Sequence, residues 1–468
     1  MTAILQRFTQ IRRGEVAPVI ASALAFFFIL TALMVLRPAR DALGMERGIE
    51  AVRWLFVGTA LATLAVNPVF GLLVSRLRRL AFIDATYLFF AASLLGFYAL
   101  LVMAPAAVGK TSGMVFFVWF SVFNLFATMV FWGLMADRFS LEQSKRLFGV
   151  IAVGGSLGAI AGPGLAAALT KPLGTPALLL VAVLLLGLAL LSVRGVVHAP
   201  PEHSAAFDPS DPSDVSDSSD VSDVSDVNAN RTVIGGSAWE GVRALFRSTY
   251  LAGIAMYILT LTVVATYIYF TRLQMVAELG DGLDARTTLF ARIDFYTQIT
   301  TLVLQALIAG RLMKHVGVPF TLALLPITAA LGFAGLALTA SLATLVLFQA
   351  AFSAVQRAFT RPARETLFTV VSRADKYKSK AFIDTFVYRS GDVVGAQVEG
   401  VLGRLGTGLG ALVSVSMPLA VVWGALGVWL GRRQEREARH RFLPIHAENE
   451  SPLAQVKAAD GILHAQHP

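Results

Sequence analysis

Two arginines and an aspartate follow the first long apolar run and could bind an anion. The run at 16–36 is followed at once by Arg37, Arg40 and Asp41. A guanidinium binds phosphate oxygens through two parallel N–H donors, and a charge at membrane depth is costly unless it faces a cavity or a partner. We therefore predict that the arginines bind substrate and that Asp41 is their counter-charge. The alternative is a cluster at the membrane interface in which Asp41 neutralises one arginine.

A second group of charges lies in a weaker apolar run near the C-terminus. Arg389 and Asp392 are three residues apart, so they can pair on one helix face. Asp384 and Asp392 cannot remain charged toward lipid, so this helix is expected to line the interior. We predict Arg389 and Lys380 as substrate ligands and the two acids as proton-coupling groups or counter-charges. A structural ion pair and a simple loop lysine are the alternatives.

Arg357, in the tenth apolar run, lies deeper than its neighbour Arg361 and is a further candidate for a cavity. The predicted substrate ligands are thus Arg37, Arg40, Arg357, Arg389 and Lys380, and the predicted counter-charges are Asp41, Asp384 and Asp392.

An aromatic stretch in the fourth apolar run could stack a purine ring. Trp119, Asn124 and Trp132 place two indoles and an amide on one segment. The alternative is packing or an interfacial belt, which is the usual role of aromatic residues in membrane helices.

Several other chemistries find no support in the sequence. The chain has no cysteine, which excludes thiol catalysis, disulfides and thiolate metal sites. Its seven histidines show no ligand spacing, so we predict no metal and no cofactor. No stretch combines a nucleophile, a base and an orienting group, so we do not expect an enzyme. No basic face is interleaved with aromatic residues, so we expect no nucleic-acid partner.

The composition requires lipid around most of the chain. Hydrophobic residues make up 56% and charged residues 15% of the 468 residues, and the mean hydropathy is +0.67; globular chains carry about 25% charge. A spanning helix needs about 20 apolar residues. Twelve such runs occur, at about 16–36, 54–75, 81–104, 113–136, 147–169, 176–193, 249–271, 289–310, 318–340, 343–360, 382–403 and 408–430. We predict an all-α membrane protein with about twelve transmembrane helices, the first of which is too long for a signal peptide and is retained.

Basic residues concentrate in alternate loops and predict the orientation. The side that is richer in Lys and Arg holds the N-terminal segment, the loops near 76–79, 138–146, 243–247, 311–314 and 373–380, and the segment after 431. Two loops of the opposite side break the pattern, one with Arg37, Arg40, Arg47 and Arg53 and the other with Arg272, Arg286 and Arg292. The balance predicts that both termini are cytoplasmic.

An acidic segment divides the chain into two parts. From Asp208 to Asp226 an aspartate recurs at every third residue, mostly followed by serine within two positions. Such a polar, like-charged tract cannot bury enough surface to fold. We predict a six-helix half at 1–198, a disordered cytoplasmic linker at 199–237, a second six-helix half at 238–434 and a cytoplasmic tail at 435–468.

The two halves are related by an internal repeat. One offset of 235 residues carries basic residues of the first half onto basic residues at equivalent span ends: Arg37 onto Arg272, Arg76 onto Arg311, Arg79 onto Lys314, Arg138 onto Arg373 and Lys145 onto Lys380. Two parallel six-helix halves are the architecture of major facilitator transporters, which bind substrate between the halves near the bilayer midplane.

Three stretches resemble the ATP/ADP translocase family, the nucleotide transporters of plastids and intracellular bacteria. Residues 36–43 read LRPARDAL, 135–149 read MADRFSLEQSKRLFG, and 361–368 and 378–384 read RPARETLF and KSKAFID. The family has Leu-Arg-x-x-Lys-Asp after its first helix, an Ala-Lys-Arg-Phe-Tyr-like element entering the fifth and Lys-Gly-Lys-Ala-x-Ile-Asp entering the eleventh. The chain departs from it at Arg40, where the family has Lys, at Ser144, where it has Ala, and in the acidic linker.

The resemblance implies a divergent bacterial member of that family. Its expected partners are the lipid bilayer and a small anionic solute, such as a nucleotide, and its expected location is the cytoplasmic membrane. ATP/ADP or NTP/NDP exchange by alternating access, with ATP binding between the halves, is the function it implies. Two alternatives remain open. One is a proton-coupled carrier of an unrelated solute, with Asp384 or Asp392 as the proton site, and the other is a membrane receptor or scaffold that does not transport.

Overall fold

The computed structural model describes residues 11–76, 79–198, 245, 247–312, 317–404 and 408–442. The acidic linker predicted at 199–237 and the part of the tail after Phe442 lie outside the described residues. Within the described residues, the regular structure is entirely helical.

The N-terminal half consists of six long helices, each of which begins where charged or turn-forming residues interrupt an apolar run. They are α2 (Val16–Gly44), α3 (Ile49–Arg76), α4 (Arg79–Met103), α5 (Ala106–Arg138), α6 (Leu141–Leu173) and α7 (Ala177–His198). A 3₁₀ turn, η1 (Arg13–Glu15), precedes α2, and another, η2 (Met45–Arg47), follows it. The start of α6 is capped by Ser140, whose side chain accepts a hydrogen bond from the Gln143 backbone, as expected of a serine N-cap.

The C-terminal half repeats this order with more broken helices. It contains α10 (Thr249–Leu279), α11 (Leu283–Leu312), α12 (Val318–Thr339), α13 (Leu342–Val355), η6 (Gln356–Thr360), α14 (Arg361–Leu367), η7 (Phe368–Val370), α15 (Arg373–Phe382), η8 (Ile383–Val387), α16 (Tyr388–Arg404) and α17 (Gly408–Phe442). Both η6 and η8 are π-helical turns, a form that is often found at functional sites. α17 continues into the range predicted as tail.

The helix boundaries agree with the predicted repeat. Adding 235 to the bounds of α2 gives 251–279, and α10 is Thr249–Leu279. The same shift takes α3 to 284–311, beside α11 at Leu283–Leu312, and α4 to 314–338, beside α12 at Val318–Thr339. These three pairs of helices therefore stand in the register that the predicted repeat gives.

Within the described part of the chain, ten helical segments are long and apolar enough to cross a membrane. The two predicted spans that do not reach this standard are the eighth, in α11, and the eleventh, in α16. Both carry charged residues in their interiors, such as Asp294 and Asp392. Their polarity follows from their place beside the cavities described below, since a helix that faces protein on several sides does not need a lipid-like surface.

The first helix differs from its prediction in a way that explains one apparent anomaly. α2 runs to Gly44 without a break at Arg37. Arginine is a good helix former, and the helix accommodates Pro38 although a proline in its interior removes one hydrogen bond and crowds the preceding turn. Arg37 and Arg40 are therefore helix residues, as is Arg272 in α10. The expectation that they are loop charges breaking the orientation rule was wrong, and these three arginines do not count against it.

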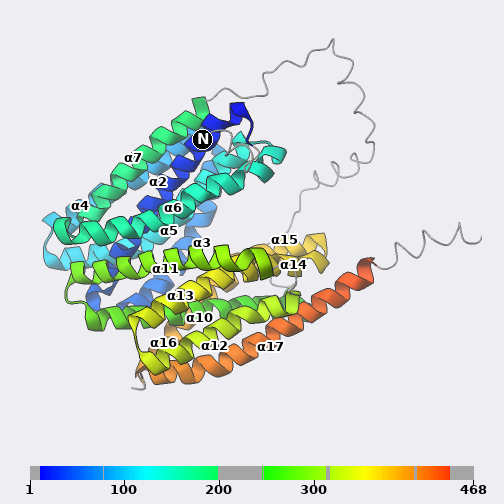
Figure 1. Ribbon diagram of the computed structural model, residues 1–468. Helices are drawn as coiled ribbons and strands as arrows, with labels where there is room; N and C mark the ends of the chain where they lie inside the picture. The colour runs from blue at the N-terminus through cyan, green and yellow to red at the C-terminus, as the bar shows by residue number, and fades with distance from the viewer. Residues whose placement is uncertain are drawn as a thin grey trace, which may run out of the picture.

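Each half has its own apolar core, and a third cluster joins the halves. The third cluster contains Ala42 and Phe117 from the first half and Phe270, Phe290 and Ala396 from the second. α6 and α2 pack against α11, and α3 packs against α16. We call the end of the bundle at which α2, α6 and α16 terminate the far end. Figure 1 shows the two halves meeting at the left and diverging toward the side on which α7 and α17 end.

Gly154, Gly158 and Gly162 form a stripe on α6, called the glycine stripe below, that brings this helix against α2 within one half. A Cβ on Gly158 would lie 2.4 Å from the Phe27 carbonyl oxygen, and one on Gly154 would lie 2.2 Å from that of Ala23. Only glycine allows so close an approach, as in other small-residue contacts between membrane helices. The stripe therefore stabilises the N-terminal half and does not lie between the halves.

Candidate functional site

A buried arginine links the two halves. Arg272 on α10 is 2% exposed and lies between Asp41 on α2 and Asp294 on α11. Its Nη1 donates to Asp294 Oδ1 at 2.6 Å, and its Nη2 donates to Asp41 Oδ2. Tyr269 Oη donates to the second Asp41 oxygen at 2.9 Å. The α2 carboxylate is thus held by two groups of the opposite half.

The two arginines of α2 extend this network on either side. Arg40 Nη1 donates to Asp41 at 3.0 Å, and its guanidinium carbon lies 3.6 Å from the centre of the Phe117 ring, a cation–π contact. Arg37 approaches Asp294 only to 3.8 Å, and 37% of its side chain is exposed. Arg40 is therefore held in place by its neighbours, whereas Arg37 is free to contact a ligand.

Two adjoining cavities of about 220 and 190 Å³ lie beside this network. Both are lined by Arg37, Ala265 and Tyr269, so these residues separate one cavity from the other. The first is also lined by Arg40, Phe56, Thr59, Phe117, Ser121, Arg389 and Asp392. The second is also lined by Arg272, Asp294, Thr297, Gln298, Gln349, Gln356 and Arg357. Residues of both halves thus form one central site.

Arg357 reaches the second cavity from the π-helical turn η6. Its nearest hydrogen-bonding side chain is Gln298, whose Oε1 is 3.5 Å from Arg357 Nη1. Among the described residues no carboxylate lies within ion-pair distance of it. A guanidinium that faces a polar cavity without a counter-charge is suited to bind an anion.

The central site carries an excess of positive charge. Five arginines line or border the two cavities, namely Arg37, Arg40, Arg272, Arg357 and Arg389, against the three aspartates Asp41, Asp294 and Asp392. Cations therefore exceed anions by two. Some buried polar atoms of this site have no hydrogen-bond partner, among them Asp294 Oδ2, Thr297 Oγ1 and Arg40 Nε. Such groups are expected to meet a ligand, an ion or water.

The structure brings together most of the predicted site residues. Arg37, Arg40, Arg357 and Arg389 all line the cavities, with Asp41 within the adjoining network. Arg389 Nη1 donates to Asp392 at 3.2 Å, which is the pair expected from their spacing.

Two predicted residues lie elsewhere. Asp384 is 3.6 Å from Arg364, and Lys380 pairs with Glu365, so both are engaged where η8 and α15 approach α14. Neither Asp384 nor Lys380 lines the central cavities. Their distance from the site reflects the position of α15, which enters the eleventh span from the end opposite the far end.

Arg272, Asp294 and Tyr269 were not among the predicted site residues. The repeat offers a signal for one of them, since the offset of 235 carries Arg37 onto Arg272. No local pattern indicates that Asp41 would pair with a residue of the other half. The glutamines of the second cavity were also missed, because isolated amides in apolar helices resemble ordinary packing.

Trp119, Asn124 and Trp132 of α5 do not line the central cavities. Trp119 stacks on Phe116 and Phe123, and Trp132 packs against Phe26 and Phe131. The packing interpretation therefore applies to both indoles. The aromatic rings that line the first central cavity are instead Phe56, Phe117 and Tyr269.

A cluster of ion pairs joins the halves at the far end. Arg53 on α3 donates to Glu399 on α16 at 2.9 Å and to Glu50 at 2.6 Å. Arg404 of α16 reaches back to Glu50 at 2.7 Å, and Gln274 of α10 donates to Glu399 at 2.7 Å. We call these five residues the far-end clamp.

A second contact at this end reinforces the far-end clamp. The Thr175 backbone N–H and hydroxyl, between α6 and α7, donate to Asp284 at the start of α11 at 2.7 and 2.6 Å. Backbone and side-chain bonds therefore hold the halves together beyond the central cavities. For the described residues, no cluster of metal-ligating side chains is found.

Comparison with known proteins gives one family match. The family model described as Major Facilitator Superfamily matches residues 16–396. No curated protein sequence matches the chain.

Solved structures show the same fold at low sequence identity. A POT family transporter in complex with a thioalcohol-conjugated peptide is 12% identical, with a TM-score of 0.58 over 89% of this chain and 96% of that one. The nucleoside transporter NupG, as a D323A mutant, is 14% identical, with a TM-score of 0.54 over 90% and 99%. A bacterial homolog of the human lysosomal transporter Spinster, inward-facing and unoccupied, is 12% identical, with a TM-score of 0.51 over 91% and 99%.

Proposed function

Because the chain belongs to the Major Facilitator Superfamily, whose members are secondary transporters with a site between two six-helix halves, we propose that it transports a small anion by alternating access. The protein is a multi-pass membrane transporter and not an enzyme. Its proposed location is the cytoplasmic membrane of a bacterium, with both termini and the acidic linker in the cytoplasm, because the positive loops gather on that side.

The observation that carries the proposal is the surplus of guanidinium groups at the central site. Arg357 has no acidic partner among the described residues, and Arg37 is only loosely paired. Uncompensated charge at membrane depth is costly, so a negatively charged ligand is the simplest group to neutralise it. A surplus of two charges matches the charge of about −2 on a phosphate monoester better than that of a monoanion.

A nucleotide-like solute is our proposal for the substrate. The stretch at 36–43 that resembles the ATP/ADP translocases includes Arg37, Arg40 and Asp41, all of which belong to the central network. Tyr269 and Phe56 offer rings near these arginines, and the glutamines of the second cavity can donate to and accept from a base or sugar. The POT and nucleoside transporters with this fold differ in their titled ligands, so the fold by itself does not select among solutes.

The proposed cycle uses the far-end clamp as one of two alternating closures. The far-end clamp holds α3 against α16 while the halves diverge toward the opposite end (Figure 1). Substrate phosphates would compete with the carboxylates of Asp41 and Asp294 for the guanidinium groups of the central site, which are those of Arg37, Arg40 and Arg272. When an arginine changes its partner from a carboxylate to a phosphate, the contact between the halves would become stronger or weaker. Exchange of one anion for another then requires no covalent step.

Uptake into proteoliposomes tests this proposal. Vesicles preloaded with ATP, ADP or unlabelled phosphate are mixed with labelled ATP, ADP, a sugar phosphate or inorganic phosphate. We expect counter-flow of at least one phosphorylated solute, and Arg357→Gln should lower it at least tenfold. Arg432→Gln removes an arginine from the exposed side of α17 and serves as the control. Folded protein that moves no anion in either direction would contradict the proposal.

A proton-coupled carrier is the second candidate, favoured by the position of Asp392. Its carboxylate lines the first cavity and pairs with Arg389 on the same helix. If transport stops when a pH gradient is collapsed, persists in Asp392→Glu but not in Asp392→Asn, and ignores phosphorylated solutes, this candidate replaces the first.

A further inference from the structure

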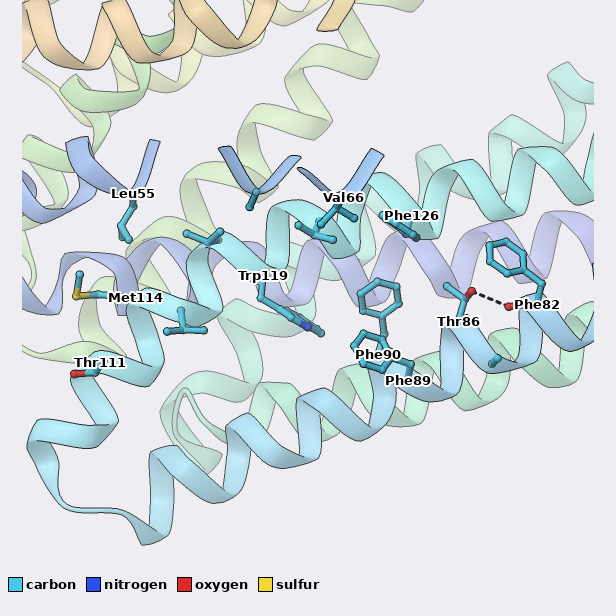
Figure 2. Close-up of a pocket in the computed structure, with 15 residues that line it drawn as sticks. Leu55, Val66, Phe82, Thr86, Phe89, Phe90, Thr111, Met114, Trp119 and Phe126 are labelled. Atoms are coloured by element: carbon cyan, nitrogen blue, oxygen red, sulfur yellow. Dashed lines mark hydrogen bonds between the residues drawn. The ribbon is translucent and has the colours of Figure 1, made fainter. Parts of the chain in front are cut away.

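A large apolar groove lies on the outside of the N-terminal half, away from the central site. Its volume is about 840 Å³, and it is formed by α3, α4 and α5. α3 and α4 each pack along α5 but touch each other little, so α5 forms the floor and the other two helices form the sides. Figure 2 shows Phe89, Phe90, Trp119 and Val66 directed into this space. We call it the α3–α5 groove.

The α3–α5 groove opens toward the surface that the bilayer covers. Phe89 is 61% exposed and Val115 is 54% exposed, and both line it. Nearly all of its lining is hydrocarbon, with Thr86 and Thr111 as the polar exceptions. The Thr86 hydroxyl already donates to the Phe82 carbonyl (Figure 2). A polar solute would find almost no partners here, whereas a hydrocarbon chain would.

The α3–α5 groove is long enough to cross one leaflet of a bilayer. Its lining extends along α3 from Leu55 to Val66 and along α5 from Thr111 to Phe126, which at a rise of about 1.5 Å per residue is about 16 Å and about 22 Å. Half of a hydrocarbon core about 30 Å thick is about 15 Å. An acyl chain of ordinary length can therefore lie in the groove from the headgroup region to the bilayer centre.

Two basic residues stand at the far-end mouth of the α3–α5 groove. Arg47, in η2, donates to the Thr111 hydroxyl at 2.8 Å, and Thr111 is the outermost lining residue on α5. Lys110 is the neighbour of Thr111, and both basic residues are exposed. Their charges lie at the end of the groove, where they could pair with the phosphate of a phospholipid whose chain occupies it.

From the apolar lining, the length and these two charges we infer that the α3–α5 groove binds an anionic phospholipid, with an acyl chain along α5 and the phosphate at Arg47 and Lys110. The opposite faces of α3 and α5 carry Phe56, Thr59, Phe117 and Ser121 of the first central cavity. A lipid in the groove would thus support the outer side of two helices that line the central site.

Native mass spectrometry of the full chain tests this inference. Protein from nanodiscs containing equal amounts of phosphatidylglycerol and phosphatidylcholine is released gently, and its retained lipids are counted. Ala62→Phe with Ala85→Phe fills the groove, and Leu184→Phe places the same ring on an exposed, lipid-facing position of α7. We expect several-fold less retained lipid in the filled variant and no change in the α7 control.

The headgroup arm uses Arg47→Gln with Lys110→Gln, which leaves the groove unfilled. We expect this variant to retain lipid but to lose its preference for phosphatidylglycerol over phosphatidylcholine. Thermal unfolding of every variant shows whether it is folded. Equal lipid retention in the wild-type, filled and control proteins would overturn the inference. An apolar solute that binds the wild type, is not displaced by lipid and is lost in the filled variant would overturn it too.

Discussion

Removal of the Arg272 charge should destabilise the protein more than any other single charge change. In Arg272→Gln the carboxylates of Asp41 and Asp294, which are 0% and 4% exposed, lose the cation that lies between them. Breaking a buried ion pair by removing one partner costs about 3–5 kcal/mol. For a unit of about 200 residues this corresponds to a fall in Tm of about 6–20 °C. Thermal unfolding in detergent, followed by tryptophan fluorescence, measures it.

The control and the rescue separate charge from packing. Arg12 forms an ion pair with Glu142 in which both side chains are about 70% exposed, so Arg12→Gln should cost at most about 1 kcal/mol. Adding Asp41→Asn and Asp294→Asn to Arg272→Gln removes the uncompensated charge and should recover most of the Tm. The electrostatic explanation is refuted if Arg272→Gln has the same Tm as the Arg12→Gln control. It is also refuted if the triple variant is no more stable than Arg272→Gln alone.

Three further predictions concern the far-end clamp, the start of α2 and the glycine stripe. Neutralising the Arg53–Glu399 pair of the far-end clamp, as Arg53→Gln with Glu399→Gln, should open the far end. The thiol of an added Thr59→Cys in this cysteine-free chain should then react several-fold faster with a maleimide added from that side; no change in rate would contradict this role. Burial tends to raise the pKa of Glu15, but hydrogen bonds from a neighbouring arginine, a backbone N–H and a glutamine outweigh it and lower the pKa from the ordinary 4.5. The wild type should therefore be about 1–3 kcal/mol more stable than Glu15→Gln at pH 7, and the difference should shrink as the pH falls below about 4.5; pH-dependent melting checks the sign. Gly158→Leu should prevent α6 from approaching α2 and lower the Tm far more than Gly187→Leu, at a site on α7 where a Cβ meets nothing within 4 Å.

The twelve helices and their two-fold repeat could be predicted because both depend on properties that are local in sequence. Hydropathy over about 20 residues indicates a span, and five basic positions in one register indicate the repeat. The end of α2 was misplaced because hydropathy falls at Arg37 although the backbone hydrogen bonds continue to Gly44. A charged residue indicates where a helix meets water only if no group inside the protein forms an ion pair or hydrogen bond with it.

The site was partly predictable for the same reason. Arginines and acids in apolar runs are unusual enough to single out Arg37, Arg40, Arg357 and Arg389, and the structure places all four at the cavities. Their partners could not be read from the sequence, since the bond between Asp41 and Arg272 depends on how the halves dock. The π-helical turn that turns Arg357 into the second cavity has no recognised sequence signal either.

The repeat is broken at the residues that give the two related arginines different roles. Arg37 and Arg272 occupy equivalent positions on α2 and α10, yet the equivalent of Asp41 is Val276 and the equivalent of Asp294 is Thr59. Both acids therefore surround Arg272, which is buried and doubly paired, whereas Arg37 is left 3.8 Å from its acid and partly exposed. If the two positions were symmetric, both arginines would be equally available to bind the substrate. Here the asymmetry makes Arg272 the link between the halves and leaves Arg37 available for the anion.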